Sequence, residues 1–243
     1  SAKTGEILVP KMKKYEIIKA PCFQVETVDD AKVYIKDLLS KNQGGYSTAI
    51  NAEKIMMYSK DSEMKSILDN SVLPVPDGSG AVLGFKFLHG LKSIRLDLPK
   101  TIFELANEEK YKVFILGSSE EVNKKATDEL KMKYPNIDIV GRENGYFDNE
   151  KELIELLKDI TPQIVMVALG SPKQEKFAAK INKILPNILF IGCGGALDIL
   201  AGKITRAPKF FQDNHIEWLY RLTLEPKRIK RQKILPVYLF KLI

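Results

Sequence analysis

The chain has 243 residues, 44% of them hydrophobic and 28% charged, so it can bury a substantial core and is not disordered over most of its length. Residues 203–243 hold ten lysines and arginines against three acidic residues, a net of +7 that equals the excess of the whole chain. No run reaches the roughly 20 apolar residues that span a bilayer, and lysines at positions 11, 13 and 14 interrupt any signal peptide. We therefore expect a cytoplasmic protein that lies on a membrane surface without crossing it.

Short β-rich runs alternate with stretches patterned as helices. In chain order, the predicted strands are 46–50, 72–75, 112–116, 137–140, 164–168 and 188–191. Between them, 119–134 and 149–160 place apolar residues at helical spacing, and Glu120 and Glu121 fall in the first turn of the former. This alternation is typical of an α/β domain with a largely parallel sheet and flanking helices.

The basic C-terminal segment predicts a separate appendage. We expect the α/β body to cover 1–202 and a helical appendage to cover 203–243, with a break at Pro226 and a kink at Pro236. Its apolar residues are suited to shallow insertion into a membrane interface: Leu235, Val237, Tyr238, Leu239, Phe240, Leu242 and Ile243. The alternative is a solvated basic helix with a frayed end. Nucleic acid is not the expected partner, because the segment lacks a spread of stacking aromatics.

Polar and glycine residues follow four of the predicted strands, at 51–53, 77–80, 170–175 and 192–195. Ligands of an open parallel sheet bind beyond the carboxyl ends of its strands, so these segments are the candidate site. Asp77 there can act as a general base, although Asp-Gly-Ser-Gly before an apolar run equally fits a helix N-cap.

A second helix start is predicted within the segment 170–175. Ser171 before Pro172 suits an N-cap with proline in the first helical position, and Gln174 and Glu175 can complete a capping box. By itself this pattern indicates helix architecture more than chemistry.

Metal and cofactor motifs are missing from the sequence. His89 and His215 are isolated, no Asp-x-Asp occurs, and the glycine-rich run 192–195 matches neither a P-loop nor a dinucleotide fingerprint. We expect no cofactor and no metal site, so that any bound diphosphate would need arginines. Cys22 and Cys193, far apart in apolar surroundings, are predicted to be buried thiols.

Taken together, these motifs resemble those of the WecG/TagA/CpsF glycosyltransferases, glycosyltransferase family 26, over about residues 21–234. The residues that carry the resemblance are, in order, Asn51-Ala-Glu53, Pro76-Asp-Gly78, Arg95, Gly145-Tyr-Phe147, Gly170-Ser-Pro-Lys-Gln-Glu175, Gly192 to Gly195, Leu200-Ala-Gly-Lys203, Arg206-Ala-Pro208, Glu217-Trp-Leu-Tyr-Arg-Leu222, Glu225-Pro226 and Arg228.

The resemblance implies an inverting, metal-independent transferase of the GT-E fold. Such an enzyme moves a sugar from a UDP-sugar to a polyprenyl-diphosphate-linked sugar at the cytoplasmic membrane face, and a homo-oligomer is compatible with the family. It implies that Asp77 is the base and that the appendage closes over the pocket and brings its arginines to the diphosphate. The predicted substrate-binding residues are Thr48, Asn51, Arg95, Gln174, Gly194, Arg221, Arg228 and Arg231.

Two departures from the family pattern bear on the donor sugar. Teichoic-acid members have threonine two residues before the asparagine, where this chain has Ala49; Thr48 is one step away and, in a strand, points to the opposite face. Many members also follow the pocket arginine with a small-Gly-x-acid pattern, whereas Arg95 is followed by Leu-Asp-Leu-Pro, with Asp97 as the nearest acid. Both N-acetylmannosamine and another hexose such as glucose therefore stay open as donors.

Two other classes of function compete with the transferase. One is a non-catalytic, membrane-associated nucleotide-binding module, which would bind vesicles but turn over no UDP-sugar. The other is a nucleotide-sugar hydrolase or epimerase, which would release product without a lipid acceptor. Neither accounts for the arginines and the apolar residues of 203–243 together.

Overall fold

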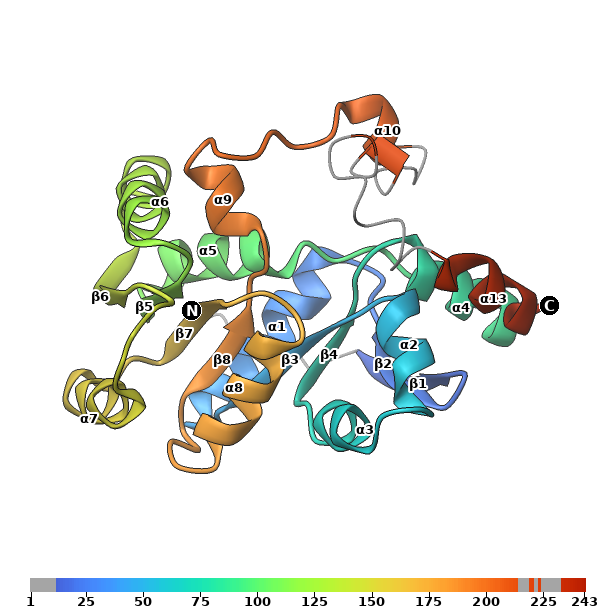
Figure 1. Cartoon of the computed structure of the whole chain (residues 1–243), viewed down its shortest axis with the longest axis horizontal. Helices are drawn as coiled ribbons and strands as arrows, with labels where there is room; N and C mark the ends of the chain where they lie inside the picture. The colour runs from blue at the N-terminus through green and yellow to red at the C-terminus, as the bar shows by residue number, and fades with distance from the viewer. Residues whose placement is uncertain (1–11, 214–218, 221–222, 224–232) are drawn as a thin grey trace, which may run out of the picture.

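The computed structural model describes residues 12–213, 219–220, 223 and 233–243, and its centre is a six-stranded sheet (Figure 1). The strand order is β4-β3-β8-β7-β5-β6, and every neighbouring pair is parallel. The strands are β3 (Gly45–Ile50), β4 (Leu73–Pro76), β5 (Lys112–Gly117), β6 (Asp138–Glu143), β7 (Ile164–Ala168) and β8 (Leu189–Gly192). All six overlap their predicted ranges, so the α/β class with a largely parallel sheet is confirmed.

Helices connect and cover the strands. They are α1 (Val28–Ser40), α2 (Ala52–Tyr58), α3 (Ser62–Asp69), α4 (Ser79–His89), α5 (Leu98–Glu109), α6 (Glu120–Lys133), α7 (Glu150–Ile160), α8 (Lys173–Asn182), α9 (Ala196–Leu200), α10 (Lys209–Asp213) and α13 (Ile234–Leu242). The two predicted helices, α6 and α7, start where the sequence indicates, because the side chains of Ser119 and Asn149 accept hydrogen bonds from their first turns.

Each face of the sheet has its own hydrophobic core. Successive strand residues point to opposite faces, so Val113 and Ile115 of β5 pack with α1, α5 and α6, whereas Phe114 and Leu116 pack with α2, α3, α7 and α8. Helices cover both faces of the sheet (Figure 1). The carboxyl ends of the strands, where polar residues follow, are therefore the natural place for a site.

A two-stranded antiparallel hairpin of β1 (Lys13–Ile17) and β2 (Ala20–Gln24) precedes the sheet and was not predicted. Ile18 and Lys19 turn the hairpin with positive φ angles of 49° and 75°. Its β1 strand packs on α4, where the rings of Tyr15 and Phe85 meet edge to face. The hairpin thereby covers one side of α4.

The last helix, α13, packs against α2 and α4. Tyr238 and Leu242 are buried in the core, so the expectation that they insert into a membrane is wrong for these two residues. Pro236 lies in the first turn of α13, where a proline is tolerated, instead of kinking a longer helix. The break expected at Pro226 lies outside the described residues, and the division into 1–202 and 203–243 stays a prediction.

The two cysteines of the chain are not joined in a disulfide. Cys22 and Cys193 are both free and buried, as predicted, and burial raises the pKa of the Cys193 thiol to about 12.

Of the helices in the described part of the chain, none has the length and apolar character needed to span a bilayer.

Candidate active site

A cavity of about 830 Å³ opens at the carboxyl ends of β3, β4, β7 and β8. Residues that follow each of these four strands line it, so it joins segments that are far apart in the sequence. Five of the predicted site residues lie in its wall: Asn51, Asp77, Arg95, Gln174 and Gly194. The sheet topology thus gathers most of the predicted set in one place.

Asn51 lies at the end of β3 and caps α2. Its Oδ1 accepts a hydrogen bond from the backbone N–H of Lys54 at 3.0 Å. The cap uses the carbonyl oxygen of the side chain, and the amide NH₂ group has no partner among the described residues. Asn51 can therefore support the helix and still donate hydrogen bonds into the cavity.

Asp77 lies at the end of β4, beside the end of β3. Its backbone N–H donates to the carbonyl of Ile50 at 2.8 Å. Helix α4 begins two residues later with Gly78 as its N-cap, at φ 80° and without a side-chain hydrogen bond, so the N-cap alternative for Asp77 is wrong. Across the part of the chain that the structure describes, the Asp77 carboxylate has no hydrogen-bond or ion-pair partner.

The other carboxylates of the cavity differ in their surroundings. The four that line it are Glu53, Asp77, Asp97 and Asp198. Asp97 caps α5 and pairs with the Arg206 guanidinium at 2.9 Å, and Asp198 accepts a hydrogen bond from the Ser118 hydroxyl at 3.5 Å. Within the described ranges, Asp77 and Glu53 alone of the four are unpartnered, and this makes them the candidates for proton transfer.

Gln174 enters the cavity from the first turn of α8. This helix begins at Lys173 with Pro172 as its N-cap and no side-chain cap, so the predicted Ser171 cap and its capping box are wrong. The Gln174 side chain lies against Gly192, where an added Cβ would come within 2.9 Å of its Nε2. Its Oε1 is buried without a hydrogen-bond partner among the described residues, which costs the fold free energy.

A buried ion pair holds together the two helices that carry Asn51 and Gln174. Lys54 Nζ of α2 lies 2.9 Å from Glu175 Oε1 of α8, and these side chains are 6% and 2% exposed. The sequence analysis missed this pair and assigned Glu175 to a capping box, because no local pattern links two positions so distant in the chain. Lys54 also lines the cavity, whereas Glu175 lies behind the wall.

One predicted site residue within the described part of the chain, Thr48, does not line the cavity. Thr48 is buried on the other side of β3, and its hydroxyl donates to Ser71 Oγ at 3.0 Å, while its neighbour Ala49 lines the cavity. The structure therefore corrects the assignment of Thr48 to substrate contact. The three arginines predicted to meet a diphosphate lie outside the described residues: Arg221, Arg228 and Arg231. His89 is exposed and bonds the Glu16 carbonyl.

The described residues contain no group of three or more histidines, cysteines, aspartates or glutamates placed to hold a metal ion. What the cavity does offer is a carboxylate without a partner among the described residues, the amide donor of Asn51 and glycine-rich backbone, all at the carboxyl ends of parallel strands. Such a set belongs to an α/β enzyme that acts on a polar ligand.

Comparison with known proteins narrows this class. The model of the glycosyl transferase WecG/TagA/CpsF family matches residues 15–243. A protein of Bacillus spizizenii named N-acetylglucosaminyldiphosphoundecaprenol N-acetyl-beta-D-mannosaminyltransferase is 31% identical over 203 residues, which cover 82% of this chain and 79% of that protein. A protein of Bacillus subtilis with the same name is 31% identical over 206 residues, or 84% and 80% of the two chains. The chain belongs to the WecG/TagA/CpsF family and is a glycosyltransferase.

Proposed function

We propose that this enzyme moves a sugar from a UDP-sugar to a polyprenyl-diphosphate-linked sugar in the synthesis of a cell-wall or surface polysaccharide. The names of the two Bacillus relatives support an acceptor of this class and N-acetylmannosamine as one donor sugar. Glucose or another hexose is the second candidate, because Ala49 lines the cavity where teichoic-acid members have threonine. The observation that carries the proposal is the unpartnered Asp77 carboxylate in the cavity wall.

The chemistry that we propose is a direct displacement with inversion. Asp77 takes the proton of an acceptor hydroxyl as its oxygen attacks the anomeric carbon of the donor, and the bond to UDP breaks with its electron pair going to the phosphate oxygen. No metal is proposed to bind the leaving diphosphate. We assign its neutralisation to Arg221, Arg228 and Arg231, whose guanidinium groups match phosphate geometry.

The remaining cavity residues are proposed to bind and orient the substrates. Asn51 offers an NH₂ donor that has no partner among the described residues, which suits the acceptor oxygen of a sugar hydroxyl, and Gln174 lines the cavity beside Gly192. Arg95 supplies positive charge, and Gly194, at φ 49°, has no atom within 4 Å of an added Cβ, so a ligand can approach its backbone.

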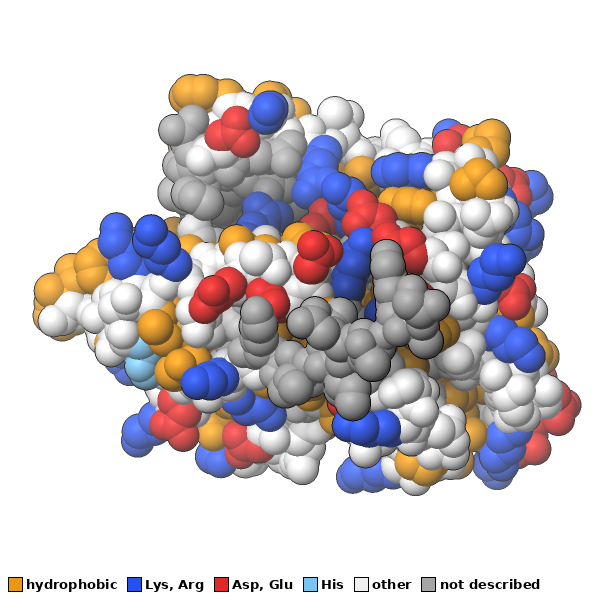
Figure 2. All heavy atoms as spheres, turned by 180° about the vertical axis from the view of Figure 1, so that it is seen from behind, with side chains coloured by type: hydrophobic (Ala, Val, Ile, Leu, Met, Phe, Trp, Pro, Cys, Tyr) orange, Lys and Arg blue, Asp and Glu red, His pale blue; other side chains and the backbone are white. Residues whose placement is uncertain are grey.

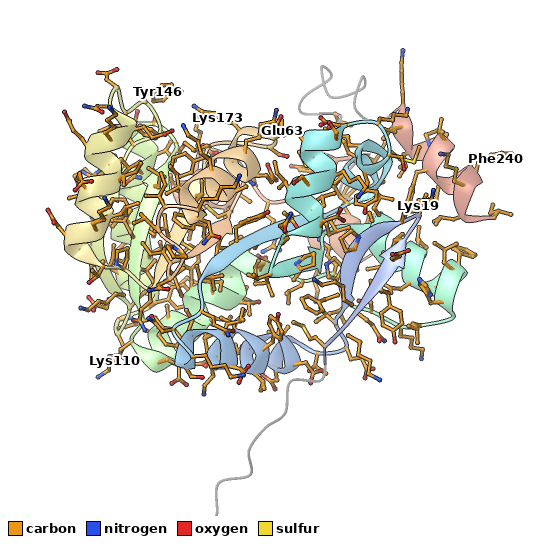
Figure 3. The ribbon with its side chains drawn as sticks, turned by 90° about the horizontal axis from the view of Figure 1, so that it is seen from below. Lys19, Glu63, Lys110, Tyr146, Lys173 and Phe240 are labelled. Carbon is orange, nitrogen blue, oxygen red and sulfur yellow. The ribbon has the colours of Figure 1, made fainter. Side chains whose placement is uncertain are left out.

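We propose that the end of the molecule formed by α4 and α13 rests on the cytoplasmic face of an anionic membrane. Exposed apolar side chains gather there beside lysines (Figure 2), and Phe240 points away from the body (Figure 3). The apolar members of this membrane-facing end are Phe87, Leu88, Val237, Phe240 and Ile243. Its lysines include Lys86 and Lys241. Apolar residues flanked by lysines suit shallow insertion between anionic headgroups.

Phe240→Ser should weaken binding to vesicles that contain anionic lipid by about five- to tenfold, since Phe240 is 82% exposed and loses its apolar contact with the bilayer. The measurement is co-sedimentation of the protein with vesicles. Met132→Ser is the matched control, because Met132 is also an exposed apolar residue, at 68%, but lies on α6, away from α4 and α13. Equal vesicle binding by both variants would contradict the assigned face.

The proposed reaction is tested by transfer from a panel of radiolabelled UDP-sugars, including UDP-N-acetylmannosamine and UDP-glucose, to a short-chain polyprenyl-diphosphate N-acetylsugar in detergent. We expect label in the lipid from one donor. Free labelled sugar released without any acceptor would favour the hydrolase, and no turnover of any donor by a protein that binds vesicles would favour the non-catalytic module. Oligomeric state stays a prediction that sedimentation would test.

A further inference from the structure

Tyr238 connects the C-terminal helix α13 to the start of α4. Its side chain is fully buried, and its hydroxyl donates a hydrogen bond to the backbone carbonyl of Gly80 at 2.6 Å. Burial raises the pKa of the phenol, so the hydroxyl keeps its proton and acts as a donor. Gly80 is the second residue of α4 and lies three positions after Asp77, so this bond ends close to the proposed base.

Two glycines one helical turn apart let α4 pack closely, Gly84 against Tyr238 and Ile17 and Gly80 against Ala52. A Cβ at Gly84 would lie 3.0 Å from the Tyr238 hydroxyl oxygen and 2.5 Å from Ile17 Cγ2. A Cβ at Gly80 would lie 3.0 Å from both Cβ and N of Ala52, the first residue of α2. The first turn of α4 therefore sits between the Tyr238 hydroxyl and the beginning of α2, directly after Asn51.

The turn that carries Asp77 is held at two points. On one side, the Asp77 N–H donates to the Ile50 carbonyl at 2.8 Å. On the other side, the Gly80 carbonyl accepts from Tyr238. Gly78 lies between these two hydrogen bonds with a positive φ, and no neighbouring atom comes within 4 Å of the position of an added Cβ. Loss of either hydrogen bond would therefore free a glycine hinge next to the carboxylate.

We propose that Tyr238 is a positioning residue for the reaction: by holding Gly80, it fixes the turn 77–80 against α2 and sets the place of Asp77 relative to Asn51. This role rests on the proposed function, in which Asp77 is the base. Through Tyr238, helix α13 contributes to the geometry of the site without any contact with a membrane. Two other residues of this helix, Ile234 and Leu235, line the cavity.

Tyr46 provides a matched control for Tyr238. It is also a buried tyrosine of the same core cluster, and its hydroxyl donates to the backbone carbonyl of Ile67 at 2.8 Å. It does not line the cavity. Tyr238→Phe and Tyr46→Phe each remove one hydroxyl group and leave one buried carbonyl without that donor, so the two losses of stability should be similar.

The experiment compares the two variants by thermal unfolding, by kcat and KM, and by hydrogen exchange of residues 76–82. We expect similar losses of Tm, with kcat reduced about tenfold or more in Tyr238→Phe, because small misplacements of a reacting group are costly, and within about twofold of wild type in Tyr46→Phe. Exchange over 76–82 should rise only in Tyr238→Phe.

Equal kcat in the two variants, or unchanged exchange over 76–82 in Tyr238→Phe, would overturn the positioning role. If the wild-type protein transfers none of the donor sugars, the proposed function fails, whereas the exchange measurement still decides whether Tyr238 holds the turn. The two failures are therefore distinguishable.

Discussion

Asp77→Asn is expected to lower the rate of sugar transfer by about 10²–10⁴-fold, the range that a general base contributes. The amide has the same shape as the carboxyl group but cannot take a proton from the acceptor hydroxyl. Because Gly78 and not Asp77 caps α4, and because the carboxylate has no described partner, the fold should be unaffected. The measurements are the initial rate at saturating donor and the affinity for UDP by calorimetry, which should stay close to that of the wild-type enzyme.

Glu53→Gln is the control for this prediction. Glu53 is the second carboxylate of the cavity without a partner among the described residues, and it lies at the first turn of α2. We expect the loss of rate in this variant to stay below about tenfold, since it removes charge without removing the base. The reverse result, an inactive Glu53→Gln enzyme and an active Asp77→Asn enzyme, would transfer the role of base to Glu53.

Lys54→Met is expected to lower the free energy of unfolding by about 3–5 kcal/mol, because it leaves the Glu175 carboxylate buried without its counter-charge. Among the described residues, Glu175 Oε2 has no hydrogen-bond partner, so the charge would keep no other stabilising contact there. The measurement is equilibrium unfolding in urea. Stability equal to that of the wild-type protein would mean that the carboxylate is not held as a buried charge.

Two further variants test whether the loss of stability comes from burying an unpaired charge or from losing any ion pair. Lys54→Met combined with Glu175→Leu replaces both charges with apolar groups and should recover most of the lost stability. Lys180 lies on α8, like Glu175, and forms an exposed ion pair with Glu150 of α7. Lys180→Met breaks this exposed pair and should change the unfolding free energy by less than about 1 kcal/mol. If Lys180→Met is as damaging as Lys54→Met, burial is not the cause.

The sheet and the location of the site were predictable because both depend on local patterns. Runs such as 164–168 are apolar and mostly β-branched over the length of a strand, and the polar residues that follow them fall at one edge of a parallel sheet by topology alone. Asn51, Asp77 and Gln174 could therefore be assigned to one place without any knowledge of their contacts.

Features that depend on tertiary contacts were not predictable in this way. Tyr238 belongs to an apolar run that equally suits a membrane, and only its packing against Gly84 separates it from the exposed Phe240. Ser171 has the sequence of an N-cap, yet the Gly170 carbonyl, not the serine side chain, accepts the Gln174 N–H. Thr48 and Ala49 are neighbours in β3. Because successive strand residues point to opposite faces of the sheet, only Ala49 reaches the cavity.

The pairing of β3 with β8 has a consequence for how the protein folds. It brings Gly45 beside Leu189 and lets the Gly192 N–H donate to Ser47 Oγ across a sequence separation of 145 residues. Asn51 and Asp77 lie near the start of that long loop, whereas Gln174 lies near its end and Gly194 just beyond it. Contacts of such range form only after a large loss of chain entropy. The cavity is therefore completed by the slowest kind of contact in the fold, and its ability to bind a ligand reports that the chain has reached its native topology.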